Sequence, residues 1–187
     1  IVIPESRDFI CNESYTTDEI TAFRDNNTLP NTPGWSVRTI PNKFSAFKLE
    51  GELELKYSGV YESCNGLGQH EVVVETPQHG VELHQLPAEQ IKQVYLMLQQ
   101  RYRYLAGDPR VKYIQIYKNR GLFAGASLEH SHSQILALPS VPRENKGLSK
   151  YYQQHGKCLL CAIQEAERES RQRLIYESEH FQLICPY

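Results

Sequence analysis

The sequence predicts an α+β fold, in which an antiparallel sheet carries one long helix packed across it. Short strand-like segments follow one another between turn residues, at 35–40, 44–49 and 70–76. One long segment, 86–107, instead repeats its apolar residues with the period of a helix. Two more strand-like segments come after that helix, at 111–117 and 130–138.

The turns between the first three strand-like segments favour an antiparallel meander. Gly51, Gly59 and the pair Asn65-Gly66 are of the residue types that mark chain reversals. The segment before them, from residue 1 to about Gly34, is polar and rich in turn residues. We therefore expect that segment to wrap around the fold.

The helix predicted over 86–107 has clear ends. Pro87 lies near its first turn, and the run Gly107-Asp108-Pro109 stops it. Its apolar residues fall on one face, which is expected to pack on the sheet: Ile91, Val94, Tyr95, Leu98, Tyr102 and Leu105.

The C-terminal part predicts a second unit. Pro139, Pro142 and Gly147 interrupt regular structure, and a helix over 161–173 and a strand over 173–184 follow. That strand has the character of one that leads into another sheet. We expect a first domain over 1–147, with a linker and the beginning of a second half over 148–187, the rest of which is absent from this sequence.

Composition excludes several classes of protein. The 187 residues, 40% hydrophobic and 22% charged, are typical of a globular protein with one substantial core. The net charge is −2 and the sequence has no long block of like charges, so it does not predict the basic surface that binds a nucleic acid polymer. Apolar runs are too short to span a membrane and no secretory signal is visible, so we expect a cytoplasmic protein. The five cysteines, an odd number, favour metal binding or free thiols over disulfides.

One motif, Glu-His-Ser-His-Ser-Gln over 129–134, carries most of the chemical information. On an extended strand His130, His132 and Gln134 project from one face, and the two serines between them project from the other. Imidazole can act as nucleophile, general base or metal ligand near neutral pH, and a carboxamide can donate to a phosphoryl oxygen. This set suits phosphate chemistry. From spacing alone, a metal-binding histidine pair and a nucleophile are about equally supported.

Further motifs surround this one in a fixed order. They are Asn42-Lys43-Phe44, NGLGQHEV at 65–72, ETPQH at 75–79, Asn119-Arg120-Gly121 and GASLEHSHSQ at 125–134. Together they resemble the galactose-1-phosphate uridylyltransferase family, a member of the histidine-triad (HIT) superfamily built from two related halves. The resemblance extends into the second half, where 175–187 is similar to the strand that opens it. With serine between its histidines, the motif also resembles that of a branch of the family, the ADP-glucose phosphorylase-like enzymes.

The resemblance implies a HIT-like fold and a two-step transfer of a nucleoside monophosphate between sugar 1-phosphates. His132 would attack the α-phosphorus of a nucleotide sugar and expel the sugar 1-phosphate, and a second sugar phosphate would take the nucleotide from the resulting nucleotidyl-histidine. Gln134 would hydrogen-bond the transferring phosphoryl group, and backbone amides of the loop 121–127 would receive its charge. The resemblance favours UDP-glucose and galactose 1-phosphate as the substrates. It also implies that the protein is a homodimer.

Four residues match family positions that bind nucleotide or phosphate: Asn42, Asn119, Gly125 and Ser127. By residue type alone, the asparagines and the loop glycines also suit ordinary turns. Two other functions stay open. One is phosphorolysis of ADP-glucose or a dinucleoside polyphosphate, and the other is a non-catalytic, zinc-stabilised nucleotide-binding protein.

The resemblance also implies structural zinc. In many relatives a Cys-x-x-Cys pair near the N-terminus joins two histidines, which correspond here to His79 and His130. The positions that match the cysteine pair hold Ser6 and Phe9, neither of which supplies a zinc thiolate.

A second cysteine pair, Cys158 and Cys161, has the spacing of half a tetrahedral zinc site. It matches a pair found in some relatives, and the remaining ligands would lie beyond the end of this sequence. Taken alone, the same spacing is compatible with two structural cysteines.

Overall fold

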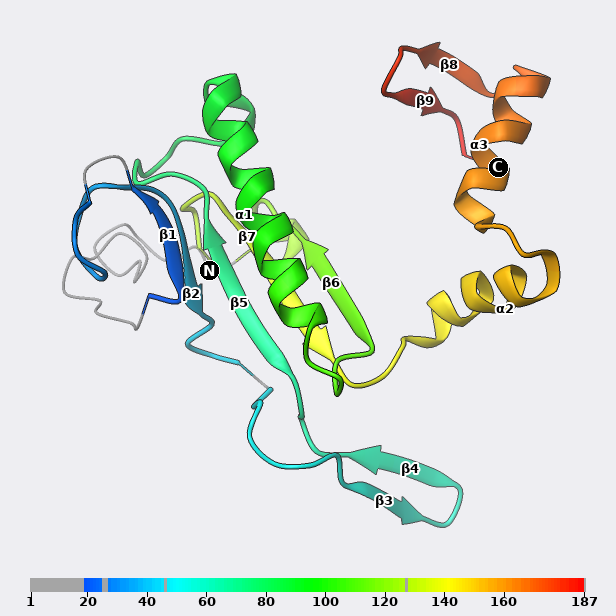
Figure 1. Cartoon of the computed structure of the whole chain (residues 1–187), viewed down its shortest axis with the longest axis horizontal. Coiled ribbons are helices and arrows are strands. Elements are labelled where there is room, and N and C mark those ends of the chain that lie inside the picture. Colours follow the sequence, from blue (N-terminus) through cyan, green and yellow to red (C-terminus); the bar gives the residue numbers. More distant parts are fainter. Residues whose placement is uncertain (1–18, 25–26, 46, 127, 187) are drawn as a thin grey trace. The chain divides into compact units, whose positions relative to one another are not determined.

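The computed structural model describes residues 19–24, 27–45, 47–126 and 128–186 (Figure 1). The chain forms two compact units, Ile1–Ser140 and Val141–Tyr187. The boundary between these units lies a few residues before the predicted one, between residues 147 and 148, and the division into two halves stays a prediction. Three residues singled out in the sequence, Ser6, Phe9 and Ser127, lie outside the described residues.

A five-stranded antiparallel sheet forms the centre of the first unit, in the order β1-β2-β5-β7-β6. Its strands are β1 (Thr21–Arg24), β2 (Trp35–Pro41), β5 (Gln69–Val74), β6 (Tyr113–Tyr117) and β7 (His132–Leu138). Figure 1 shows the helix α1 (Ala88–Ala106) lying across one face of this sheet. The arrangement is the α+β fold that the sequence predicts.

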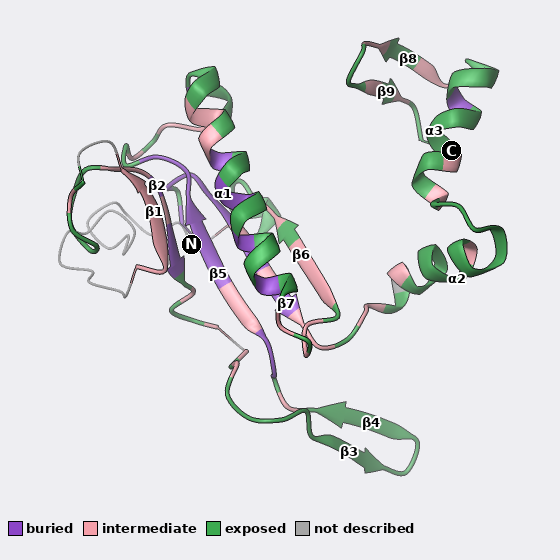
Figure 2. Ribbon diagram, in the orientation of Figure 1, coloured by how far each residue is buried: buried purple, intermediate pink, exposed green. Residues whose placement is uncertain are grey.

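The core lies between α1 and the sheet. Val37, Val73 and Ile135 come from three adjacent strands and pack with Met97 of α1 in one buried cluster (Figure 2). Because side chains alternate along a strand, Val72 and Val74 point to the opposite face, in a second buried cluster. The sheet therefore has one face that α1 covers, the helix face, and one that α1 does not cover, which we call the open face. The motif at 129–134 contributes to both.

The helix α1 buries a slightly different stripe from the one predicted. Val94, Met97, Leu98, Arg101 and Leu105 are its buried residues. By contrast, Tyr95 and Tyr102, expected on the packed face, are 61% and 47% exposed. Both follow a buried position by one residue, which turns them about 100° away from the stripe. None of the described helices is long and apolar enough to cross a membrane.

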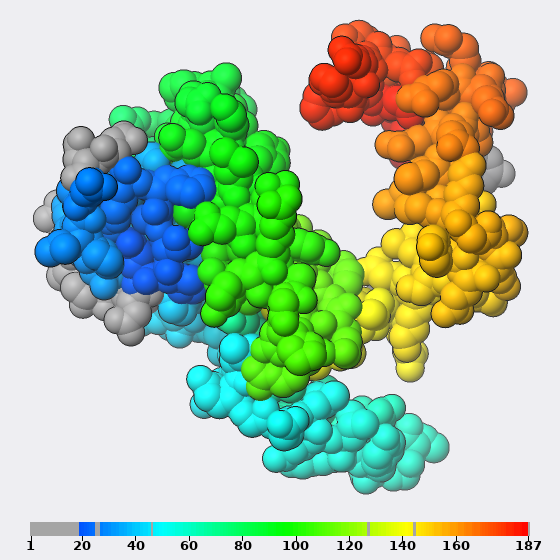
Figure 3. All heavy atoms as spheres, in the orientation of Figure 1, coloured from blue at the N-terminus to red at the C-terminus, as the bar shows by residue number. Residues whose placement is uncertain are grey.

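One prediction for the segment between β2 and β5 is wrong, and one hairpin there was not predicted. The described residues of the segment 44–49 form no strand but only one isolated bridge, between Lys48 and Leu67. The following residues form an unpredicted hairpin, β3 (Leu55–Ser58) and β4 (Tyr61–Cys64), that projects from the first unit (Figure 3). Every residue of the hairpin's strands is exposed. The residues Leu53, Leu55 and Tyr57 alternate with polar ones as in a strand, but Gly51 and Gly59 on either side favoured turns.

The second unit comprises α2 (Lys146–His155), α3 (Leu159–Ser170) and a hairpin of β8 (Leu174–Glu177) and β9 (Gln182–Ile184). The sequence predicted neither α2 nor the turn that divides the predicted strand 173–184. The helix α2 contains no buried residue, although Leu148, Tyr151 and Tyr152 recur at helical spacing. Pro142 before it and Gly147 in its first turn favoured a loop there. That this unit begins a second half of the HIT type stays a prediction.

Candidate active site

The strand β7 begins at His132, so it carries the last three residues of the motif and not His130 as predicted, and it places these three on both faces of the sheet. Ser133 lies two residues before Ile135 of the core cluster and so faces α1. His132 and Gln134 occupy the alternate positions and face the open side of the sheet. The structure thus places the side chains of His132 and Gln134 next to each other on one face of the sheet, with the serines of the motif on the other face.

His132 has a fixed orientation. Its side chain is buried, and its Nδ1 lies 2.7 Å from the carbonyl oxygen of His130. A carbonyl oxygen can only accept, so Nδ1 carries the proton and donates. In the neutral imidazole the other nitrogen, Nε2, then keeps its lone pair, which is the electronic form that a nucleophile requires.

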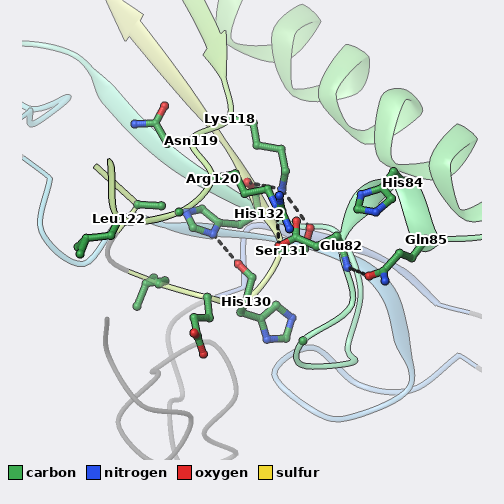
Figure 4. Close-up of a pocket in the computed structure, with 15 residues that line it drawn as sticks. Glu82, His84, Gln85, Lys118, Asn119, Arg120, Leu122, His130, Ser131 and His132 are labelled. Atoms are coloured by element: carbon green, nitrogen blue, oxygen red, sulfur yellow. Dashed lines mark hydrogen bonds and ion pairs between the residues drawn. The ribbon is translucent and has the colours of Figure 1, made fainter. Parts of the chain in front are cut away.

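A cavity of about 570 Å³ lies beside His132 (Figure 4). Its volume falls within the roughly 300–1,000 Å³ that is typical of small-molecule sites. Its lining is polar and charged, and comes from the segment after β6, from the turn before α1 and from the motif itself: Lys118, Asn119, Arg120, Glu82, His84, Gln85, His130, Ser131 and His132. Of the predicted binding residues, the structure therefore places Asn119 at this cavity.

Several backbone amides of the loop that begins at Gly121 donate hydrogen bonds within the loop itself. Gly121 and Gly125 have φ angles of +77° and +79°, which glycine adopts without strain. The amides of Ala124, Gly125 and Ala126 donate to carbonyl groups within the loop, at 3.0 to 3.2 Å. These three amides are satisfied within the loop; that backbone amides of the loop 121–127 receive phosphoryl charge stays a prediction.

Gln134 belongs to a polar cluster on the open face of the sheet. Its Oε1 lies 2.8 Å from His70 Nε2, 3.1 Å from the Tyr117 hydroxyl and 3.4 Å from Asn42 Nδ2. With Oε1 occupied in this way, the amide NH₂ of Gln134 is the end that can donate to a substrate. Asn42, predicted to bind substrate, is thus placed against Gln134 and is not among the residues that line the cavity.

Two groups of this cluster are held uncharged. Burial lowers the pKa of His70, and its hydrogen bond with Gln134 acts in the opposite direction with a smaller effect. Burial also raises the pKa of Tyr117, which keeps its hydroxyl protonated. Neutral donors can therefore fix the Gln134 side chain without adding charge to the site.

Sequence reasoning missed four residues around the motif: His70, Tyr117, Glu75 and Lys118. Glu75 offered a signal, because alternation after Val73 places its carboxylate on the buried helix face, where a carboxylate needs a cation. The cation is Lys118, whose Nζ lies 2.9 Å from Glu75 Oε2. Its identity follows only from the pairing of the strands.

The predicted metal ligands form two separate pairs. The rings of His79 and His130 lie 5.6 Å apart in an edge-on arrangement, and His130 Nε2 is 2.7 Å from the carbonyl oxygen of Thr76. Cys158 and Cys161 are exposed free thiols at the start of α3. Within the described part of the chain, no three His, Cys, Asp or Glu residues are grouped so that they could hold a metal ion. A tetrahedral zinc site takes four ligands, so neither pair completes one by itself, and zinc binding at either pair stays a prediction.

Comparison with known proteins gives concordant matches. A family model described as galactose-1-phosphate uridyl transferase, N-terminal domain, matches residues 25–142. An ADP-glucose phosphorylase from Arabidopsis thaliana is 35% identical over 161 residues, which cover 83% of this chain and 44% of that protein. A galactose-1-phosphate uridylyltransferase from Thermotoga maritima is 35% identical over 158 residues, which cover 82% and 49%.

Solved structures agree with these matches. The structure of an ADP-glucose phosphorylase from Arabidopsis thaliana with bound ADP-glucose has a TM-score of 0.69 and 30% identity, covering 93% of this chain and 53% of that one. This similarity confirms the predicted α+β, HIT-like fold. The chain spans about half the length of the curated relatives that it matches.

Proposed function

Because the chain belongs to the galactose-1-phosphate uridyl transferase family, as its motifs predicted, we propose that it carries the nucleophile of a sugar-phosphate nucleotidyltransferase. One observation carries the proposal: His132 lies beside a polar cavity with Nδ1 tied to a carbonyl group, so that Nε2 holds a lone pair. A metal-ligand role for His132 has less support, because the histidine ring that lies against His79 is that of His130 and not that of His132.

In the proposed first step, His132 Nε2 attacks the α-phosphorus of a nucleotide sugar. A nitrogen–phosphorus bond forms, the bond from phosphorus to the oxygen of the sugar phosphate breaks, and that oxygen leaves with the electron pair. The carbonyl group of His130 accepts from Nδ1 and stabilises the positive charge that develops on the ring. In the second step the oxygen of an incoming phosphate reverses the process.

Gln134 serves the phosphoryl group in this proposal. Its Oε1 is held by His70 and Tyr117, which leaves its NH₂ to donate to a phosphoryl oxygen. That oxygen gains charge as the nucleophile approaches, so a donor already in position stabilises the transition state more than the ground state. Asn119, at the cavity, would contact the nucleotide or the acceptor phosphate.

We propose UDP-glucose and galactose 1-phosphate as the substrates; the similarity to relatives named galactose-1-phosphate uridylyltransferase supports a uridylyl group and this acceptor. A second candidate is phosphorolysis of ADP-glucose, with inorganic phosphate as the acceptor. It is favoured by the serine between the histidines, Ser131, and by the similarity to ADP-glucose phosphorylase. Both reactions use the same nucleophile and differ in nucleotide and acceptor.

Kinetics separate these readings from simple nucleotide binding. We expect the full-length protein to give parallel double-reciprocal lines, and to exchange label between a nucleotide sugar and its sugar 1-phosphate without any acceptor. A panel of labelled UDP- and ADP-sugars, with galactose 1-phosphate or inorganic phosphate as acceptor, identifies the substrates. Intersecting lines without partial exchange would exclude the double displacement, and absence of both turnover and exchange would favour a binding protein.

We also propose that Cys158 and Cys161 bind structural zinc in the full-length protein. Both thiols are exposed at the start of α3, with the spacing of a zinc-binding pair. Metal analysis should show about one equivalent of zinc fewer per chain in the Cys158→Ser, Cys161→Ser variant. Cys64→Ser, which removes another exposed free thiol, is the matched control and should retain all the zinc. Equal zinc in the double variant and the control contradicts the proposal.

A further inference from the structure

A buried carboxylate lies directly behind the strand that carries His132. Glu75 follows the last residue of β5, and its side chain is fully buried on the helix face. Its Oε1 accepts from the Ser133 hydroxyl at 2.6 Å, and its Oε2 accepts from the Ser131 hydroxyl at 2.5 Å. The two serines that flank His132 in sequence therefore bind the same carboxylate.

Lys118 completes this cluster. Its Nζ lies 2.9 Å from Glu75 Oε2, and it also donates to the Ser131 hydroxyl at 3.0 Å and to the carbonyl oxygen of His132 at 3.1 Å. Three consecutive residues are thus held: Ser131 and Ser133 by their side chains, and His132 by its backbone. We call Glu75, Lys118, Ser131 and Ser133 the Glu75 cluster.

The Glu75 cluster is anchored to the rest of the fold. Gln90 of α1 donates from its side-chain amide to the carbonyl oxygens of Glu75, at 2.8 Å, and of Ser36, at 2.7 Å. The backbone amide of Glu75 donates to the carbonyl oxygen of Ser131 at 3.2 Å. A fully satisfied buried network of this kind rigidifies the segments that it joins.

His132 needs such an anchor because it stands at the end of its strand. The pairing of β7 with β5 ends at Val74 opposite His132, and the pairing with β6 ends at Gln134. Strand pairing therefore holds His132 only on the side of β5, next to the loop that contains Gly121 and Gly125. Strand ends are less constrained than strand centres, whereas a nucleophile must stay aligned with its target.

We propose that the Glu75 cluster positions His132 for attack, and this inference rests on the proposed function. Glu75, Lys118, Ser131 and Ser133 are positioning residues: they fix the backbone from 131 to 133, and through it the direction of His132 Nε2. Displacement of a reacting group by about 1 Å can cost roughly 100-fold in rate. Loosening the cluster should therefore slow the chemical step without weakening substrate binding.

Ser133→Ala tests the inference best. Ser133 is 5% exposed, faces away from His132 and is not among the residues that line the cavity, so its hydroxyl does not bind substrate. Single-turnover labelling with the nucleotide sugar identified for the unsubstituted full-length protein should slow by about 10- to 100-fold. The dissociation constant from the same experiment should stay within about twofold, because no group at the cavity has changed.

Thr39→Val is the matched control. Thr39 lies on the same face of the sheet, in the row that runs from Thr39 through Val73 to Ser133. Its hydroxyl is buried and has no hydrogen-bond partner among the described residues. This variant also removes one buried hydroxyl, and it should label at the rate of the unsubstituted protein. Ser133→Thr keeps the hydroxyl and should recover at least part of the rate lost in Ser133→Ala.

The outcomes distinguish this inference from the proposed function. Labelling of Ser133→Ala at the unsubstituted rate, with thermal melting showing that it is folded, overturns the role of the Glu75 cluster and leaves the proposed function intact. An equal loss of rate in Thr39→Val and Ser133→Ala also overturns it, because the effect is then one of general packing. Absence of label in the unsubstituted protein overturns both.

Discussion

Replacement of His132 by glycine is expected to abolish transfer of label from a nucleotide sugar to the protein. The substitution removes the Nε2 lone pair, and no other ring nitrogen is held in the same orientation beside the cavity by a described contact. Loss of the nucleophile in covalent enzymes lowers turnover by about 10⁴-fold or more. The measurement is acid-labile label that remains on the denatured protein after incubation with nucleotide sugar.

His130→Asn is the control for that experiment. The contact that orients His132 uses the backbone carbonyl of His130, which the substitution leaves in place. The His130 side chain instead contacts the carbonyl oxygen of Thr76 and packs against His79. This variant should therefore lose thermal stability while it keeps most of the labelling. Acid-labile label on the His132→Gly protein would show that another residue is the nucleophile.

The sequence predicts the fold well where burial imposes a period. The helix over 88–106 and the strands at 35–41, 69–74 and 132–138 each place apolar residues against a common core. The hairpin formed by β3 and β4 has two exposed strands, and α2 has no buried residue. Both elements carry an apolar period, in 53–58 and in 148–152, but the turn residues beside them, Gly51, Gly59 and Gly147, favoured loops.

The site was predictable up to the point where the topology decides it. The alternation of side chains in β7 follows from residues 130–134 alone, because it depends only on local geometry. The partners of those side chains come from elsewhere: Glu75 meets Ser133 because β5 pairs with β7, and Asn42 reaches Gln134 from the end of β2. A single sequence contains no signal for that order of strands.

Arg101→Met is expected to give the largest loss of stability in the first unit. Arg101 is 5% exposed in α1, and its guanidinium donates to both oxygens of Glu71, at 2.7 and 2.8 Å. The substitution leaves a fully buried carboxylate without its cation, which typically costs about 3–5 kcal/mol. Urea unfolding at pH 7, followed through Trp35, the single tryptophan of the chain, measures the loss.

The double variant Arg101→Met, Glu71→Leu shows where this loss originates. If the cost is that of an uncompensated buried charge, removing the carboxylate as well should recover most of the free energy of unfolding, because apolar replacement of a whole buried pair is often close to neutral. Arg103→Met, an exposed position on the same helix, should change stability by less than about 0.5 kcal/mol. A double variant no more stable than Arg101→Met would mean that the arginine acts through its packing on α1. The packing contact in question joins the guanidinium carbon of Arg101 to the Tyr104 ring, whose centre lies 4.4 Å away.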